Sequence, residues 1–298
     1  MAGFTVAVVQ GATPQPQQEI PLPDLERAVA ESPLLSLAED PQSADLRVEA
    51  FPEGIFRFYR RGEANALAAV KIPVKRPQAL PRKLQSLLEH MAAYTNLQRL
   101  QPPKPFLGES IKVEFFRLVT PASPTTPPEV APVTTNPAGE LVFATGDNLV
   151  ISVSHTAPDP LHVYVISLDT RRLSSTLVYP YSPDQSAKIL PGETLIIGGG
   201  PVYTVELQLP PEDTTALDLF KVWVSASAID PKVMILPSLG LRQEPSSDPY
   251  GAGSRLDRDL RQAILGQTGL TPFPDFYRDP WWCCQQGIRT ERSPSENS

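Results

Sequence analysis

The alternating run from Leu161 to Leu168 constrains the fold of this chain more than any other segment. Leu161, Val163 and Val165 alternate with neighbours such as Tyr164, and β-branched and aromatic residues dominate the run. A period of two with this composition is typical of a β-strand that is buried on at least one face. The sequence therefore predicts a sheet core built around this run.

Similar segments recur beyond residue 104, at intervals of roughly 8–20 residues with turn residues between them. This spacing is typical of a mainly antiparallel β-sandwich, and we expect Val163, Val165, Val222 and Val224 to point into its core. The predicted strands are Ile111–Val119, Leu141–Ala144, Asn148–Ser154, Leu161–Leu168, Leu173–Tyr179, Thr194–Ile197, Tyr203–Leu209, Leu219–Ala226 and Trp281–Thr290. One short helix is expected late in this region, at Leu256–Leu265.

Prolines shape the rest of the prediction. The chain holds 35 prolines among 298 residues, which is well above the usual share of roughly 5% and disfavours long helices. Six of them fall in Thr120–Pro137 (residues 120–137). Because this segment lacks apolar periodicity, we predict a surface loop without a role in folding.

The first 103 residues predict a small mixed α/β domain, so the fold class of the whole chain is α+β. Its expected strands are Phe4–Gln10, Leu34–Leu37, Asp45–Ala50 and Ile55–Tyr59, and its expected helices are Leu25–Ser32 and Pro81–Leu100. The second helix has apolar residues at helical spacing on one face. Gln101–Pro105 follows it with three prolines, which predicts a boundary between domains 1–103 and 104–298.

Charge and hydropathy exclude several function classes. The net charge of −7 argues against a general nucleic-acid or anionic-membrane binder. No signal peptide is expected, because no basic and apolar segment follows Met1. No window approaches the length of a membrane span, so the expected compartment is the cytoplasm.

The chain has two cysteines, Cys283 and Cys284, which are adjacent and are the only candidates for a cysteine nucleophile. Their Cα atoms lie about 3.8 Å apart, below the usual disulfide range of roughly 4.4–6.8 Å. Metacaspases place their nucleophile in an Asp-Cys-Cys-His-Ser-Gly motif, whereas this chain reads Trp-Cys-Cys-Gln-Gln-Gly. A cysteine peptidase also needs an imidazole within reach, and no histidine follows His162. We therefore predict no catalytic residue here.

Other motifs also lack the partners that their chemistry requires. His90, His155 and His162 have no metal-ligand spacing, although the last two are placed to face each other across a predicted hairpin. Gly198–Gly200 is followed by a strand pattern instead of the Lys-Ser/Thr and helix of a phosphate loop. The remaining charged candidates are interpreted as turn residues, Asp159 and Asp169, and as solvated basic residues, Lys71–Arg76 and Arg82-Lys83. No cofactor or metal is predicted.

An aromatic segment near the C-terminus is the one candidate for an interaction site. It contains Phe273, Phe276, Tyr277, Trp281 and Trp282. Two interpretations are open, because such a cluster can cap the sandwich or form an exposed docking patch.

Several short motifs resemble a domain of undefined role that follows the caspase-like peptidase domain in bacterial caspase-family proteins. The segments that carry the resemblance are Gly146–Val153, Leu161–Leu168, Leu177–Pro180, Leu190–Glu193, Asp218–Val222, Asp279–Trp282 and the helix end Ala93–Leu97. The resemblance implies a β-sandwich, and it implies no activity because the role of that domain is undefined. The peptidase domain itself, with its His and Cys motifs, is missing here. The resemblance leaves open whether this chain is part of a longer peptidase or stands alone.

These observations favour a non-catalytic accessory, regulatory or protein-interaction region associated with a caspase-like cysteine peptidase. The expected partner is a protein, namely the peptidase domain in cis or in trans, or its substrate. Two alternatives remain: an unrecognised cysteine peptidase or hydrolase, and a carbohydrate- or surface-binding β-sandwich.

Overall fold

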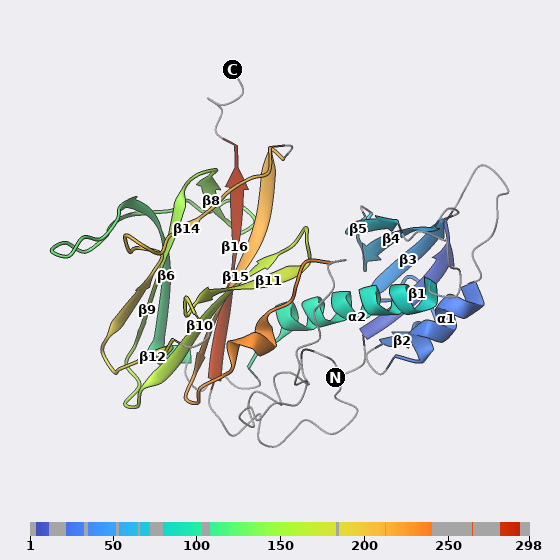
Figure 1. Cartoon of the computed structure of the whole chain (residues 1–298), viewed down its shortest axis with the longest axis horizontal. Helices are drawn as coiled ribbons and strands as arrows, with labels where there is room; N and C mark the ends of the chain where they lie inside the picture. The colour runs from blue at the N-terminus through green and yellow to red at the C-terminus, as the bar shows by residue number, and fades with distance from the viewer. Residues whose placement is uncertain are drawn as a thin grey trace. The chain divides into compact units, whose positions relative to one another are not determined.

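The structure of this chain is a computed structural model, and strands predominate in it over two α-helices among the described residues. It describes residues 4–11, 22–32, 35–51, 54–64, 66–71, 80–102, 108–182, 185–211, 213–239, 264 and 281–292. The fold is α+β with several sheets, and it divides into two compact units (Figure 1). The first is built mainly from residues 1–100 and the second mainly from residues 101–237 and strand β16 (Trp281–Glu291).

The first unit contains a five-stranded sheet in the order β2-β1-β3-β4-β5. Its strands are β1 (Phe4–Gln10), β2 (Leu35–Leu37), β3 (Leu46–Phe51), β4 (Ile55–Arg60) and β5 (Ala68–Lys71). β1 is parallel to β2 and β3, and the β3-β4-β5 run is antiparallel. This arrangement follows from helix α1 (Leu22–Ala30), because parallel neighbours such as β1 and β2 need a crossover connection between them.

Helix α2 (Leu80–Arg99) carries the longest apolar stripe of the first unit and packs against α1. Pro81 lies in its first turn, where the missing backbone N–H removes no helical hydrogen bond. Near its end, Asn96 Nδ2 donates to the carbonyl oxygen of Ile264 at 3.0 Å. Ile264 therefore belongs to the first unit, although the sequence placed it in the β-domain. No helix in the described ranges has the length and apolar content needed to cross a membrane.

The second unit contains two sheets. The six-stranded sheet has the order β11-β10-β15-β16-β8, with β12 beside β10, and the five-stranded sheet has the order β13-β9-β6-β7, with β14 beside β9. The strands of the first are β8 (Leu141–Ala144), β10 (Leu161–Asp169), β11 (Ser174–Tyr179), β12 (Lys188–Ile189), β15 (Thr215–Ser225) and β16. Those of the second are β6 (Ile111–Thr120), β7 (Glu129–Pro132), β9 (Asn148–His155), β13 (Thr194–Ile197) and β14 (Val205–Glu206).

Strand β15 is central to the six-stranded sheet, because it pairs with β10 on one side and β16 on the other. Val163 lies opposite Val224, and Val165 lies opposite Val222. All four side chains have no exposed surface. The prediction that these four valines point into the core is confirmed.

The structure differs from the sequence-based expectation at the short strands. Thr120–Pro137 was predicted as a loop, but it contains β7, which pairs with β6 as an edge strand and tolerates Pro132 there. Tyr203–Leu209 was predicted as one strand, and only Val205–Glu206 pairs with β9. β5 and β12 were not predicted. Of the predicted helix Leu256–Leu265, all but Ile264 lies outside the described residues.

We expect Val165→Asp to unfold the second unit, because the new carboxylate would lie without a partner in a fully buried position. The free energy of unfolding should fall by about 3–5 kcal/mol, as measured by urea denaturation followed by circular dichroism. Val202→Asp is the matched control, since Val202 is 77% exposed, and it should leave the midpoint unchanged. An unchanged midpoint for Val165→Asp would contradict this assignment of the core.

Candidate functional site

The two cysteines lie next to each other on β16, so their side chains point to opposite faces of the sheet. Cys283 is buried opposite Trp223, and its thiol donates a weak hydrogen bond to Gln101 Oε1 at 3.4 Å. Cys284 is half-buried opposite Val222. The strand therefore holds both thiols within the sheet instead of presenting them in an open site.

Both thiols are held in their protonated form. Burial raises the pKa of Cys283 to about 11, against an opposing effect of the Lys221 ammonium group. Burial, together with the neighbouring Cys283, raises the pKa of Cys284 to about 12. A cysteine nucleophile needs the opposite shift, because the thiolate is the reactive form. These positions are unfavourable for nucleophilic catalysis.

Lys221 and two tryptophans share the face of the sheet that carries Cys283. Lys221 has no exposed surface, and its Nζ lies 5.3 Å from the ring centroid of Trp223. Trp223 stacks on Trp281, with centroids 4.9 Å apart and planes 8° from parallel. Burial lowers the pKa of Lys221 to about 8, although the cysteines oppose this shift. The ring of Trp223 stabilises the ammonium form by a cation–π contact.

The histidines do not join this cluster. His162 on β10 lies opposite Ser225, and β15 separates it from β16, where Cys283 lies. Adjacent strands are about 4.8 Å apart, and His162 and Cys283 are also offset by two residues along the strands, so their backbones lie more than two strand spacings apart. His162 is therefore not a strand neighbour of Cys283. Nδ1 of His162 has no hydrogen-bond partner in the described part of the chain.

The expected hairpin between His155 and His162 is wrong. His155 is the last residue of β9 in one sheet, and His162 lies near the start of β10 in the other sheet. The connection between them therefore crosses from one sheet to the next. His155 is 2% exposed, and His90 lies on α2. The described residues contain no group of three or more His, Cys, Asp or Glu side chains that could hold a metal ion.

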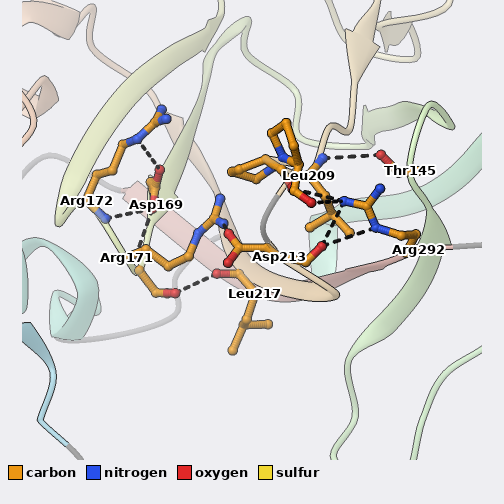
Figure 2. A network of polar contacts seen from close by, with 11 residues as sticks. Thr145, Asp169, Arg171, Arg172, Leu209, Asp213, Leu217 and Arg292 are labelled. Atoms are coloured by element: carbon orange, nitrogen blue, oxygen red, sulfur yellow. Dashed lines mark hydrogen bonds and ion pairs between the residues drawn. The ribbon is translucent and has the colours of Figure 1, made fainter. Parts of the chain in front are cut away.

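A polar network lies where β10 ends and β15 begins, at the far end of these strands from His162 (Figure 2). Asp169 closes the turn after β10, because its Oδ1 accepts hydrogen bonds from the backbone N–H groups of Arg171 and Arg172 at 2.8 and 2.9 Å. Its Oδ2 lies 3.9 Å from Arg172 Nε. The Thr170 hydroxyl donates to the carbonyl oxygen of Leu217 on β15 at 2.6 Å. Asp169 was predicted as a turn residue, but it is the last residue of β10, and only its side chain stabilises the turn that follows.

The same network continues to the end of β16. The Arg171 guanidinium forms an ion pair with Asp213. The Arg292 guanidinium donates to the carbonyl oxygens of Pro210, Pro211 and Asp213 at 3.0–3.4 Å (Figure 2). Because arginine offers five N–H donors in one plane, a single side chain can satisfy several carbonyl groups of this loop. The contacts of Arg292 therefore stabilise the loop that contains Pro210, Pro211 and Asp213.

Asp218 is the perturbed group beside this network. It lies directly opposite Asp169 on the neighbouring strand, and it is largely buried. Burial, together with the Asp169 carboxylate, raises its pKa from 3.8 to about 6, against the opposing charges of Arg171 and Arg172. Like charges in directly paired positions are destabilising. Asp218 can therefore exchange a proton in the mildly acidic range.

Gly198 begins the loop that connects β13 to β14, and both of these strands pair with β9. Its φ is +82°, and a Cβ atom there would lie 2.3 Å from the carbonyl oxygen of Leu149, so only glycine fits. Gly199 accepts a hydrogen bond from Ala122 N at 2.9 Å. The glycine run predicted as a strand connection therefore positions the loop tip, where Val202 and Tyr203 are exposed.

Tyr203 is fixed although it is 53% exposed. Its ring stacks on Tyr181 with centroids 4.1 Å apart and planes 6° from parallel. Tyr181 meets the buried Tyr179 edge-on at 5.4 Å. The Tyr181 hydroxyl accepts a hydrogen bond from Gly198 N at 3.2 Å. This tyrosine stack (Tyr179, Tyr181 and Tyr203) therefore connects an exposed ring to the core.

Several apolar side chains of the five-stranded sheet and of the Gly198 loop are exposed. Val130 is 36% exposed, Ile196 is 40% exposed and Val202 is 77% exposed. Strand register places Val130 and Ile196 on the same face of the five-stranded sheet. A Cβ at Gly199 would lie within about 3 Å of both Ile196 and Pro128, so the loop backbone at Gly199 lies close to these two side chains. We call Val130, Ile196, Val202 and Tyr203 the Tyr203 surface.

The sequence had indicated a different aromatic cluster. Of its five residues, Trp281 is 3% exposed and lies in the core, and Trp282 is half-buried. Phe273, Phe276 and Tyr277 lie outside the described residues. The ring of Trp281 is therefore buried, whereas that of Tyr203, which the sequence placed inside a strand, is exposed.

The other predicted charged positions are exposed where the structure describes them. Asp159 is exposed in a turn, and Lys71 is exposed on β5. Arg82 and Lys83 are exposed on α2, and residues 72–76 lie outside the described residues. No protein-family model, curated protein or solved structure matches the chain.

The raised thiol pKa values predict slow alkylation. In the folded chain at pH 7.5, iodoacetamide should modify Cys283 and Cys284 much more slowly than in urea-unfolded chain, as followed by mass spectrometry. The reason is that each thiol holds its proton and is at most half-exposed. Free cysteine added to the same tube is the internal control. Alkylation of either residue faster than this control would favour the peptidase alternative.

Asp218→Asn should stabilise the protein at neutral pH and not in acid. A carboxyl group whose folded pKa is raised to about 6 from 3.8 contributes stability below pH 4 that is lost as the pH rises through 6. The variant should therefore gain about 1–2 kcal/mol at pH 7.5 and little at pH 4, as measured by chemical denaturation. Asp159→Asn, in an exposed turn, is the control. A gain of equal size at both pH values would exclude the carboxylate charge as the cause.

Proposed function

We propose that this chain is a non-catalytic protein-interaction region, and that it docks a partner protein through the Tyr203 surface. The observation that carries this proposal is the tyrosine stack. Tyr203 is half-exposed, yet its ring is held in one orientation by Tyr181. Tyrosine is enriched among the residues that dominate the binding energy of protein interfaces.

Pre-organisation supports this role for Tyr203. A free surface side chain loses about 0.5–1.5 kcal/mol of entropy when an interface immobilises it. The Tyr203 ring is already immobilised by stacking, and both ends of its loop are anchored to β9. The neighbouring Val202 and Ile196 add apolar area that a partner can bury. The surface thus combines an aromatic anchor with an apolar surround.

The chemistry of the cysteines supports a non-catalytic role. Both thiols have raised pKa values, and β15 lies between the strand of Cys283 and that of His162. The buried Lys221 lies against Trp223 and is equally withdrawn from solvent.

The nature of the partner rests on the sequence resemblance. We propose a caspase-like peptidase domain, in cis or in trans, or its substrate. We also propose that the two sheets of the second unit pack as a β-sandwich. Consecutive buried residues on β10 from Val163 to Ile166 support this packing, because both faces of that strand are then covered.

A carbohydrate ligand is the second candidate, and Tyr203 itself favours it. One face of the ring lies on Tyr181, so the exposed half of the side chain includes the other face. A flat aromatic face of this kind can stack on the C–H face of a sugar ring. The apolar neighbours Val202 and Ile196 favour a protein, because a sugar offers them no complementary surface.

We expect Tyr203→Ala to weaken partner binding by at least about tenfold. The probe is the purified caspase-like peptidase domain encoded nearest to this chain in its genome, with binding measured by biolayer interferometry. Leu37→Ala is the control, since Leu37 is 41% exposed in the first unit and should not change the affinity. The melting temperature of Tyr203→Ala should match that of the unaltered chain.

Two outcomes would reject the proposal. Equal affinities of Tyr203→Ala and the unaltered chain would remove the Tyr203 surface from the interface. Binding to a glycan array that depends on Tyr203, without binding to the peptidase domain, would favour the carbohydrate candidate.

A further inference from the structure

Helices α1 and α2 of the first unit pack against each other and against its sheet. α1 contacts β1 and β2, and α2 contacts α1 and β2. The strand residues on the face that they cover, such as Val6, Leu46 and Val48, are at most 1% exposed. The opposite face alternates with these positions and carries Arg47, Glu49, Phe51, Arg57, Tyr59 and Lys71. We call these six residues the arginine face.

Aromatic rings hold the two arginines of this face. Arg47 lies opposite Tyr59 on the neighbouring strand, and its guanidinium carbon is 4.7 Å from the centroid of that ring. The guanidinium carbon of Arg57 is 4.6 Å from the centroid of Phe51. A guanidinium that stacks on a ring keeps its in-plane N–H donors free for another ligand. Both arginines are therefore oriented before any ligand binds.

The charges of the arginine face are not balanced. Glu49 lies directly opposite Arg57, but it pairs with Arg47 at 3.4 Å. No carboxylate within the described ranges lies within ion-pair distance of Arg57 or Lys71, and both side chains are exposed. One acidic group therefore faces three basic ones, which leaves an excess positive charge on this face.

We propose that the arginine face binds an acidic segment of a partner protein, with Arg57 forming a bidentate hydrogen-bonded ion pair with an Asp or Glu side chain. The two parallel N–H groups of arginine match the two oxygens of a carboxylate. Such charge-assisted hydrogen bonds are stronger than hydrogen bonds between neutral groups. Lys71, on the adjacent edge strand β5, supplies a second cation on the same face.

The arrangement of charges on the arginine face favours an acidic peptide segment as its ligand. Glu49 lies between the two arginines and would repel a continuous phosphate backbone. A peptide can place a carboxylate at Arg57 and an uncharged residue beside Glu49. This interaction does not depend on the proposed role of the Tyr203 surface, because it uses residues of the other unit.

The test measures binding of a fluorescein-labelled octaglutamate peptide to the full chain by fluorescence anisotropy at an ionic strength of about 0.05 M, where exposed charges are weakly screened. Arg57→Gln should weaken binding by about tenfold. Arg57→Lys should recover only part of this loss, because lysine keeps the charge and lacks the planar pair of donors.

The matched control is Arg82→Gln, which removes the same charge from an exposed position on α2 and should change the affinity less than twofold. Equal losses for Arg57→Gln and Arg82→Gln would show nonspecific attraction and overturn the proposal. Absence of octaglutamate binding, or tighter binding of duplex DNA of equal charge, would also overturn it. The melting temperature of Arg57→Gln should not change, since the side chain is exposed.

Discussion

The register of β15 between β10 and β16 is the constraint on which the candidate sites of the second unit depend. It places Val222 and Val224 on one face and Lys221 and Trp223 on the other. A slip of one residue would exchange these faces, and would bring a lysine into the valine core. The same register sets Asp218 opposite Asp169. The valine pairs stabilise this register, and the register determines both the surroundings of the thiols and the pairing of Asp218 with Asp169.

Strong alternation made much of this fold predictable. β10 and the central valines were predicted because their pattern has a period of two, and α2 because its apolar residues have helical spacing. β5, β7 and β12 were missed. Each is a short edge element of two to four residues, whose pairing depends on a neighbouring strand more than on its own composition. Local pattern carries little information about such strands.

The candidate sites were less predictable, because register and stacking join residues that are distant in the sequence. Asp169 was predicted as a turn residue, but it ends β10, and the raised pKa of Asp218 depends on burial and on the opposite strand. Tyr203 was assigned to a strand, and its exposure depends on Gly198 and on a ring that lies 22 positions earlier, Tyr181. The sequence directed attention to Trp281, which is buried against Trp223.

The two proposed surfaces share one physical device, which is an aromatic ring that fixes a side chain before a partner arrives. Tyr181 supports Tyr203 in the second unit, and Phe51 supports Arg57 in the first. In each case folding has already restricted the rotamers that binding would otherwise have to restrict. The supporting ring contributes to affinity through this restriction and not through contact with the partner. Its importance should therefore be greatest for Arg57, because a free arginine side chain has more rotamer entropy to lose than a tyrosine.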